Sequence, residues 1–241
     1  MSMALANIKW RIISGSGLKM MAMIVMLIDH LAAFLFYDNH LFIEPLFEFC
    51  NKPITLYFIF RLIGRIAFPI FAFLLVEGFQ HTRSVKKYLI NILLFAIISE
   101  LPWNLVHGGH WYCVGSQNVF FTLLLGGCGL YVIENVREIR KQAFILIGLL
   151  VLSIFLRADY GVSGYGFILM MYALRKSELI RAVVGSCMLG SRWIAGLAFV
   201  PISMYNGKRG FIQGKYMKYL FYAFYPLHLM AIYVLNIVLK L

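Results

Sequence analysis

The stretch ITLYFIFRLIGRIAFPIFAFLLVEGFQ at residues 54–80 decides the class of this fold. It is longer than the roughly 20 apolar residues with which a helix crosses a bilayer. The whole chain shares this character, since 62% of its 241 residues are hydrophobic and only 13% are charged. Soluble domains average about 45–50% apolar and about 25% charged residues, and one of this length has too little interior for the excess. The composition excludes a disordered chain, a coiled coil and a disulfide-rich secreted domain, and it disfavours a soluble enzyme.

Further apolar segments on both sides of this stretch predict an all-α, polytopic bundle of transmembrane helices. A crossing with its loop takes about 25–30 residues, which gives roughly eight or nine crossings. We expect residues 1–17 to be a cytoplasmic lead and residues 18–241 to form a single domain. The segment 178–205 is ambiguous, because two short spans or a re-entrant hairpin around Gly190-Ser191-Arg192 would both suit it. The other expected spans are residues 18–37, 54–80, 86–106, 118–135, 142–156, 160–174 and 216–239.

The net charge of +12 is explained by orientation in the membrane. Lys and Arg gather before the first span and after the second, fourth and sixth, while the intervening loops are poor in both. Because such residues collect in cytoplasmic loops, the N-terminus is predicted to be cytoplasmic. The basic loop 205–218 is placed on the same side, and no nucleic acid partner is expected.

Metal and redox chemistry have little support in the sequence. The four cysteines form no CxxC pair, so no metal site is expected. Glu77 and His81, four positions apart, suggest a helix-end pair rather than metal ligands. Cys50 and Cys113 fall in predicted outer loops, where a disulfide and two free thiols both remain open.

Charged side chains inside the expected spans are few and costly, at about 2.5–3.5 kcal/mol each near the middle of a helix. Arg61 and Arg65, four positions apart, share one helix face and should point into the bundle. Asp29 is expected to pair with an arginine, and Gly64 and Pro69 permit a kink. The topology places these and further polar residues in one outward-leaning cluster: Asp29, His30, Arg61, Arg65, Glu100, Asn104, Asn118, Asp159 and His228. Ion pairs that fix helix register and a functional site are both open interpretations.

Lys19 and His30 are eleven positions apart, which returns them to nearly the same face of a helix at a separation of about 16 Å. The lysine would lie at the cytoplasmic rim and the histidine deeper in the bundle. An anionic ligand held at the rim could extend a long arm to a base inside, and coenzyme A has that shape. A lysine that snorkels at a helix end is the ordinary alternative.

Several motifs resemble the TraX family, the conjugative-pilin acetylase family of integral membrane proteins. They occur in the family's order and cover most of the chain from about residue 19. The family is distantly similar to larger membrane acyltransferases of sugars, in which a basic residue, usually arginine, precedes a histidine at the spacing of Lys19 and His30. The motifs are MLIDH (26–30), RLIGRIAFPIFAFLLVEGFQHTR (61–83), ISELPWN (98–104), NVFFTLLLG (118–126), DYGVSGYG (159–166), YNGKRG (205–210) and FYAFYPLHL (221–229).

The resemblance implies an acetyltransferase of the bacterial inner membrane that uses acetyl-CoA to acetylate a peptide or protein amine. The acceptor could also be a sugar hydroxyl or a small amine. We expect His30 to act as general base, with Asp29, Arg65, Glu100 and His228 as further catalytic candidates and His228 as a second possible base. The expected cofactor-binding residues are Lys19, Arg61, Arg65, Tyr205, Asn206, Lys208 and Arg209, and the expected substrate-binding residues are Asn104, Asn118, Asp159 and Tyr160.

Two other classes of function compete with acyl transfer. The buried arginines would also suit a transporter or channel for an anionic solute. A non-catalytic assembly factor would use the same polar residues to hold its helices or its partners. Only the resemblance separates acetylation from other acyl transfers.

Overall fold

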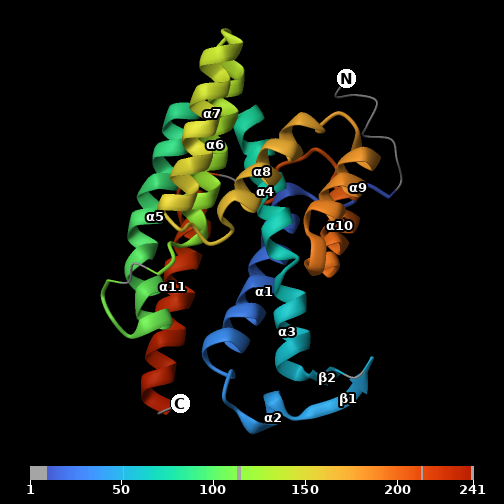
Figure 1. Ribbon diagram of the computed structural model, residues 1–241, viewed down its shortest axis with the longest axis vertical. Helices are drawn as coiled ribbons and strands as arrows, with labels where there is room; N and C mark the ends of the chain where they lie inside the picture. Colours follow the sequence, from blue (N-terminus) through green and yellow to red (C-terminus); the bar gives the residue numbers. More distant parts are fainter. Residues whose placement is uncertain (1–9, 51, 113–114, 213, 240–241) are drawn as a thin grey trace. The chain divides into compact units, whose positions relative to one another are not determined.

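The computed structural model describes residues 10–50, 52–112, 115–212 and 214–239. It is 74% helical, which confirms the all-α class. Its elements, labelled in Figure 1, belong to two compact units. The first unit comprises Met1–Phe71 and Leu189–Leu241, and the second comprises Ala72–Met188.

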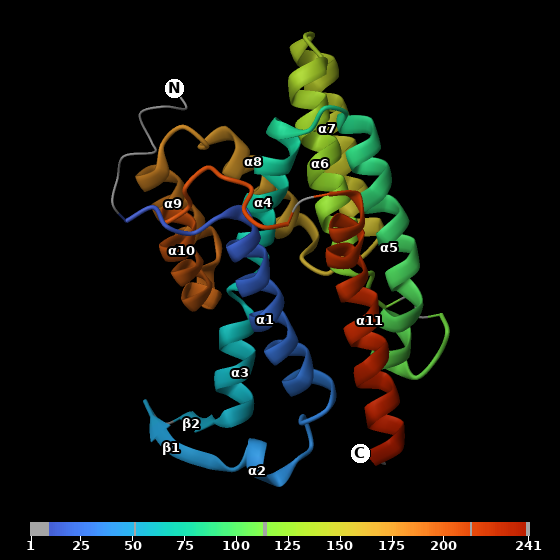
Figure 2. The same cartoon turned by 180° about the vertical axis from the view of Figure 1, so that it is seen from behind.

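The first unit is built around α1 (Gly15–Phe34), which packs against α3 (Leu56–Gly64) and α11 (Lys215–Leu239). Figures 1 and 2 show these three helices side by side. Between α1 and α3 lie α2 (His40–Ile43) and an antiparallel hairpin of β1 (Pro45–Phe49) and β2 (Lys52–Thr55). The 3-10 helix η1 (Gly190–Ala198) runs into α10 (Phe199–Ser203) and contacts α3.

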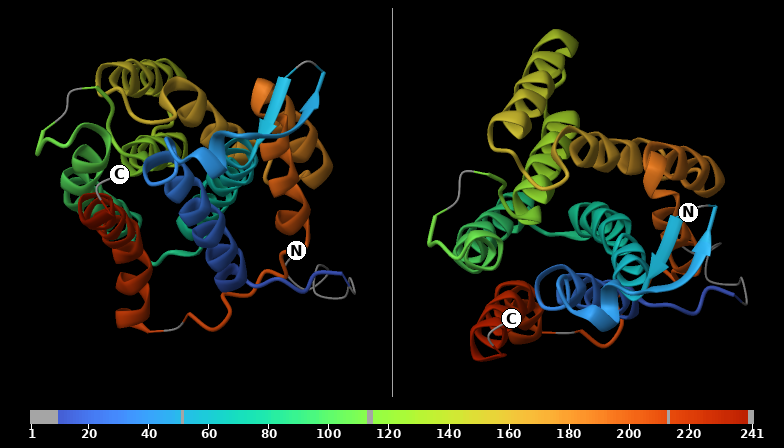
Figure 3. Two further views of the ribbon diagram at one scale, coloured as in Figure 1. Left: turned by 90° about the horizontal axis from the view of Figure 1, so that it is seen from below. Right: turned by 60° about the horizontal axis from the view of Figure 1, so that its bottom comes forward.

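The start of α1 is fastened by the loop that follows α10. Ser14 is the N-cap of α1, and its hydroxyl accepts from the amide of Gly17. The amides of Gly15 and Ser16 donate to the carbonyl oxygens of Lys208 and Arg209, both at 2.9 Å. The first N–H groups of the helix, which have no partner within the helix, are therefore bonded to the loop. Figure 3 shows this loop beside the N-terminal stretch.

The second expected span, residues 54–80, is interrupted as its Gly and Pro suggested. Helix α3 ends at Gly64, and α4 (Ala67–His81) begins after a turn at Arg65 and Ile66. Pro69 lies in the first turn of α4, where its missing N–H has no intrahelical partner to lose. The turn places Arg61 and Arg65 at the end of a short helix.

The second unit is centred on α6 (Val119–Asn135), which packs against α5 (Val85–Gly108), α7 (Ile139–Phe155) and α8 (Gly161–Ala173). A side chain at Gly126 would collide with Ile168 of α8, so this glycine permits close approach of the two helices. The last helix, α9 (Glu178–Met188), packs against α8. Among the described residues of α7 only Ser153 is buried, and Phe144 and Phe155 are each 79% exposed.

Among the described residues, four helical stretches are long and apolar enough to cross a membrane: Gly15–Phe34, Leu56–His81, Val85–Gly108 and Tyr216–Leu239. They support a membrane protein. Apolar helices of 10–17 residues, such as Val119–Asn135 and Gly161–Ala173, are shorter than a bilayer requires on their own. In the ambiguous segment the helix is broken at Gly190, whose φ of +53° lies in the left-handed region.

Candidate functional site

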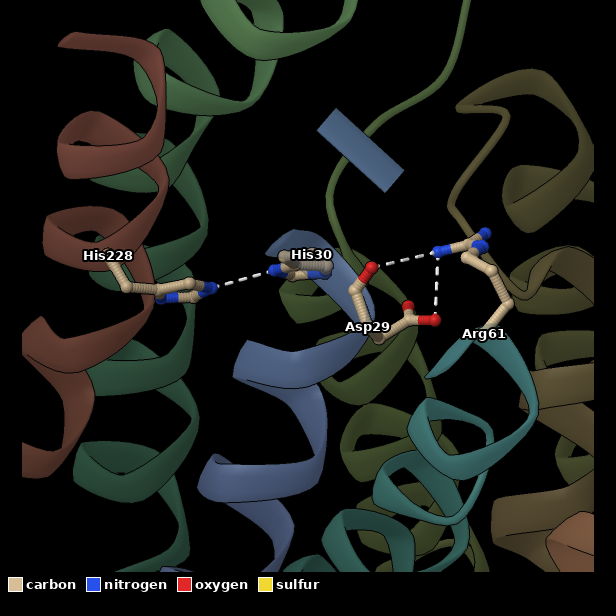
Figure 4. Close-up of polar contacts among 4 residues, drawn as sticks. All are labelled: Asp29, His30, Arg61 and His228. Atoms are coloured by element: carbon tan, nitrogen blue, oxygen red, sulfur yellow. Dashed lines mark hydrogen bonds and ion pairs between the residues drawn. The ribbon is translucent and has the colours of Figure 1, made fainter. Parts of the chain in front are cut away.

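The first unit holds a hydrogen-bonded pair of histidines between α1 and α11. His30 Nδ1 lies 2.7 Å from His228 Nε2, and the two ring planes are only 5° apart. The 5.0 Å separation of the ring centroids is that of nearly coplanar rings joined edge to edge. His228 is buried, with 7% of its surface exposed. Figure 4 shows the two rings meeting across the helices.

Three aromatic side chains surround this pair. Phe34 and Tyr225 lie against the His30 ring, with centroids 5.7 and 6.0 Å away. Phe224 lies 4.8 Å from the His228 ring, and its carbonyl oxygen is 2.7 Å from His228 Nδ1. The rings packed against the pair are therefore aromatic. Both nitrogens of His228 have a hydrogen-bond partner: Nε2 meets His30 Nδ1, and Nδ1 meets the Phe224 carbonyl oxygen.

Asp29, next to His30 in α1, faces a different helix. Its carboxylate oxygen Oδ1 lies 2.8 Å from Arg61 Nη1 of α3, and the same nitrogen donates to the Asp29 carbonyl at 3.4 Å. The expected pairing of Asp29 with an arginine is thus confirmed. Arg65 also acts electrostatically on Asp29. Gly64 makes the approach possible, because a β-carbon there would overlap the Asp29 side chain.

Positive side chains gather at the opposite end of α1. Lys208 and Arg209 are exposed in the loop whose carbonyl oxygens cap the helix. Lys19, one turn into α1, interacts electrostatically with Arg209 and with Lys218 of α11. Anions would therefore be attracted to this end of the first unit.

The basic side chains and the histidine pair both lie along the contact between α1 and α11, which run parallel. We call this contact the seam. Lys19 lies close enough to Lys218 for their like charges to repel, and His30 is hydrogen-bonded to His228. Further along, the Asn236 side-chain amide donates to the Phe34 carbonyl at 3.1 Å. The helix is unbroken from Lys19 to His30, so the expected separation of about 16 Å along one face holds.

Tyr205 and Asn206 contribute to the fold at the start of this loop. Residues Ile13 and Tyr205 form a parallel bridge, and the Asn206 amide donates to the Ile13 carbonyl at 2.9 Å. The Asn206 side-chain oxygen accepts from the Lys208 amide at 2.9 Å. The positive charge that this loop offers a ligand is therefore carried by the side chains of Lys208 and Arg209.

The remaining site candidates belong to the second unit. The Asn118 side-chain nitrogen donates to Glu100 Oε2 at 2.6 Å and to the Ala96 carbonyl at 2.9 Å. Its oxygen accepts from the Phe120 amide as the N-cap of α6, so Asn118 is engaged in the fold through both ends of its amide. Glu100 is thereby tied to the start of α6. The roles of these residues toward a substrate stay predictions.

Asn104, Asp159 and Tyr160 lie in different surroundings within that unit. Asn104 is buried, and its side-chain nitrogen donates to the Trp111 carbonyl at 3.4 Å. Asp159 is exposed before α8, and its amide donates to the Gln117 carbonyl at 2.9 Å. Tyr160 is the N-cap residue of α8, with a carbonyl that accepts from Ser163.

The structure describes no cluster that suits a metal: within the ranges it covers, no group of three or more His, Cys, Asp and Glu side chains converges. Glu77 and His81 form the expected helix-end pair, with His81 Nδ1 3.7 Å from the carboxylate. Cys50 is exposed, while Cys113 lies outside the described residues. The disulfide between them stays a prediction.

Lys218 was not among the expected site residues, although a signal for it existed. It precedes His228 by ten positions in α11, much as Lys19 precedes His30 by eleven in α1. Two neighbouring parallel helices thus carry the same order of lysine and histidine. Asn236 had no such signal, since an asparagine near the end of an apolar helix is not distinctive.

Comparison with known proteins agrees with the motifs. A family model described as "TraX protein" matches residues 14–236. The chain is similar to a "Probable fimbrial assembly protein FimC, serogroup H1" of Dichelobacter nodosus, with 28% identity over 244 residues. The match covers 90% of this chain and 93% of that protein. No solved structure matches the chain.

Proposed function

Because the chain belongs to the TraX family, we propose that it is an integral membrane acetyltransferase. It moves an acetyl group from acetyl-CoA to the amine of a peptide or protein, or to a hydroxyl group. We place it in the bacterial inner membrane with a cytoplasmic N-terminus and eight or nine passes, as the distribution of Lys and Arg favours.

The observation that carries this proposal is the hydrogen-bonded pair of half-buried His30 and buried His228. Ionisable side chains within membrane helices are expensive and mark functional sites by default. Imidazole, with an ordinary pKa of about 6.5, can take up and return a proton near neutral pH. The hydrogen bond between the two rings gives a proton donor and a proton acceptor side by side, an arrangement that suits proton transfer.

In the proposed reaction, His30 removes a proton from the acceptor as its nitrogen or oxygen bonds to the acetyl carbonyl carbon. The thioester C–S bond then breaks, and the sulfur leaves with the bonding electron pair. The proton passes from His30 to this sulfur, which releases coenzyme A as a thiol. Such acid–base catalysis contributes roughly 10²–10⁴-fold to a rate.

The arginines of α3 are assigned different tasks. Arg61 Nη1 is engaged twice by Asp29, so Arg61 serves mainly to order α1 against α3. Arg65 is then the better candidate for stabilising the oxyanion or a coenzyme A phosphate. At the cytoplasmic end, Lys19, Lys208 and Arg209 attract the nucleotide, and the pantetheine arm follows the seam toward His30.

The proposal is tested with the purified full chain in lipid nanodiscs and radiolabelled acetyl-CoA. The acceptors are a peptide with a free α-amine, the same peptide with a blocked amine, and a sugar. We expect transfer to at least one acceptor, and a loss of roughly 10²–10⁴-fold in His30→Ala. The matched control is His81→Ala, since the His81 side chain is 72% exposed at a helix end. Transfer at the wild-type rate by a folded His30→Ala protein would contradict the base assignment.

A non-catalytic assembly factor is the second candidate, and the name of the fimbrial relative favours it. In that case the wild-type chain transfers no acetyl group to any of these acceptors. His30→Ala then supports pilus or fimbrial assembly in cells as well as the wild type does. Anion flux into liposomes without acetyl-CoA would instead favour a transporter.

A further inference from the structure

The hydrogen bonds of His228 determine where its proton lies. A carbonyl oxygen only accepts hydrogen bonds. The Phe224 carbonyl oxygen is 2.7 Å from His228 Nδ1, so this nitrogen carries the hydrogen. A neutral imidazole has one N–H group. The other nitrogen, Nε2, therefore presents a lone pair to His30.

The position of the His228 proton in turn determines the position of the His30 proton. Its Nδ1 lies 2.7 Å from the lone pair of His228 Nε2, so His30 Nδ1 must be the donor. The neutral His30 ring then has its lone pair on Nε2. We infer that His228 is a positioning residue that fixes the tautomer of His30, so that Nε2 of His30 is the basic nitrogen. This inference rests on the proposed acetyl transfer for its functional meaning, but the tautomer itself does not.

Burial makes the neutral form of His228 the relevant one. A charge removed from water is destabilised unless another charge or strong hydrogen bonds compensate. The rings packed against the pair are those of Phe34, Phe224 and Tyr225. The neighbouring carboxylate, Asp29, is directed to Arg61 on the other side of α1 (Figure 4). A positively charged His228 would have no carboxylate partner among these groups.

The arrangement also prepares His30 for the proton that it receives. When Nε2 takes a proton, the ring becomes positive while Nδ1–H still points at His228 Nε2. That hydrogen bond becomes charge-assisted and stronger, without movement of either helix. A carboxylate plays the corresponding part in serine proteases, where it holds the imidazole in the correct tautomer. Here the orienting group is a neutral imidazole behind the base, so His228 is assigned as the support of His30 and not as a second base.

Two substitutions at His228 separate positioning from packing. In His228→Gln, the amide oxygen can accept from His30 while the amide nitrogen donates to the Phe224 carbonyl. In His228→Leu, similar volume is kept and the acceptor is lost. We expect kcat in His228→Gln to stay within about tenfold of wild type, since the amide oxygen still accepts the hydrogen bond from His30 with altered geometry. We expect kcat in His228→Leu to fall roughly 10²–10⁴-fold with little change in KM, because the base has the wrong tautomer.

The tautomer is read directly by ¹⁵N NMR of ring-labelled histidine in the full chain in nanodiscs, without acetyl-CoA. The His30 signals are assigned by their loss in His30→Gln. We expect a protonated Nδ1 and an unprotonated Nε2 in wild type and in His228→Gln, and the opposite in His228→Leu. A protonated Nε2 in wild type, or an unchanged tautomer in His228→Leu, would overturn the inference. If the tautomer is as expected but no acceptor is acetylated, the proposed function fails and the positioning role of His228 stands.

Discussion

Gly64→Ala should loosen the contact between α1 and α3 at the level of the histidine pair. The added β-carbon would overlap both the β-carbon and the carboxylate of Asp29. Rotation of the Asp29 side chain cannot relieve the first of these overlaps, because the backbone fixes a β-carbon. Helix α3 must therefore move away from α1, which lengthens the 2.8 Å contact between Asp29 and Arg61.

The magnitude follows from three terms. Overpacking costs about 1–3 kcal/mol, and loss of a hydrogen bond between charged groups costs about 1.5–3 kcal/mol. The higher helix propensity of alanine returns at most about 1 kcal/mol. The side chains of Asp29 and Arg61 are 16% and 26% exposed, so the ion-pair term belongs at its lower end. We expect a net loss of about 2–4 kcal/mol in the free energy of unfolding.

The assay is unfolding of the purified chain in mixed micelles with increasing denaturing detergent, followed by tertiary-structure signals. Gly148→Ala is the matched control, because Gly148 lies within α7 and a β-carbon there meets no atom within 4 Å. We expect Gly148→Ala to be neutral or slightly stabilising. Equal stability of Gly64→Ala and Gly148→Ala would refute the close approach of α1 and α3.

Three further predictions concern the basic end of the first unit and its orientation. Lys19→Glu should raise KM for acetyl-CoA roughly 10–100-fold with little effect on kcat, and Lys19→Arg should not, as steady-state kinetics at several salt concentrations will show. Gly210→Ala should lower the free energy of unfolding by about 1–3 kcal/mol, measured by thermal unfolding, because φ at Gly210 is +86° and the new β-carbon would meet Ser14. Lys208 lies in the basic loop expected in the cytoplasm, and His110 lies in the expected outer loop between spans 86–106 and 118–135. In a background without native cysteines, Lys208→Cys and His110→Cys should react with an impermeant thiol reagent from opposite sides of the membrane, and reaction from one side would overturn the expected topology.

The lengths of the helices were the most predictable part of the fold. The expected span 86–106 corresponds to Val85–Gly108, and 118–135 corresponds to Val119–Asn135. Apolar runs reveal these helices because the bilayer demands that every backbone polar group be bonded within the segment. Segment 178–205 was ambiguous because its break depends on backbone angles at Gly190, which hydropathy does not record.

The sequence predicted which types of residue form the candidate site, but not every contact between them. A charge in an apolar span requires a counter-charge, so a partner for Asp29 was expected among the arginines. The bond between His30 and His228 joins residues 198 positions apart, and no local pattern encodes which helices become neighbours. The tautomer depended on the Phe224 carbonyl, a backbone atom whose position no side-chain pattern reveals.

The contact between α1 and α11 can form only late in the synthesis of this protein. His30 leaves the ribosome early, whereas His228 follows 198 residues later. At about 5–20 residues per second, the first helix waits roughly 10–40 s in the membrane for its partner. The amides of Gly15 and Ser16 wait almost as long for the carbonyl groups that cap them. A ribosome that stalls before the last helix therefore leaves a chain in which His30 has no His228 to bond and the seam between α1 and α11 is missing.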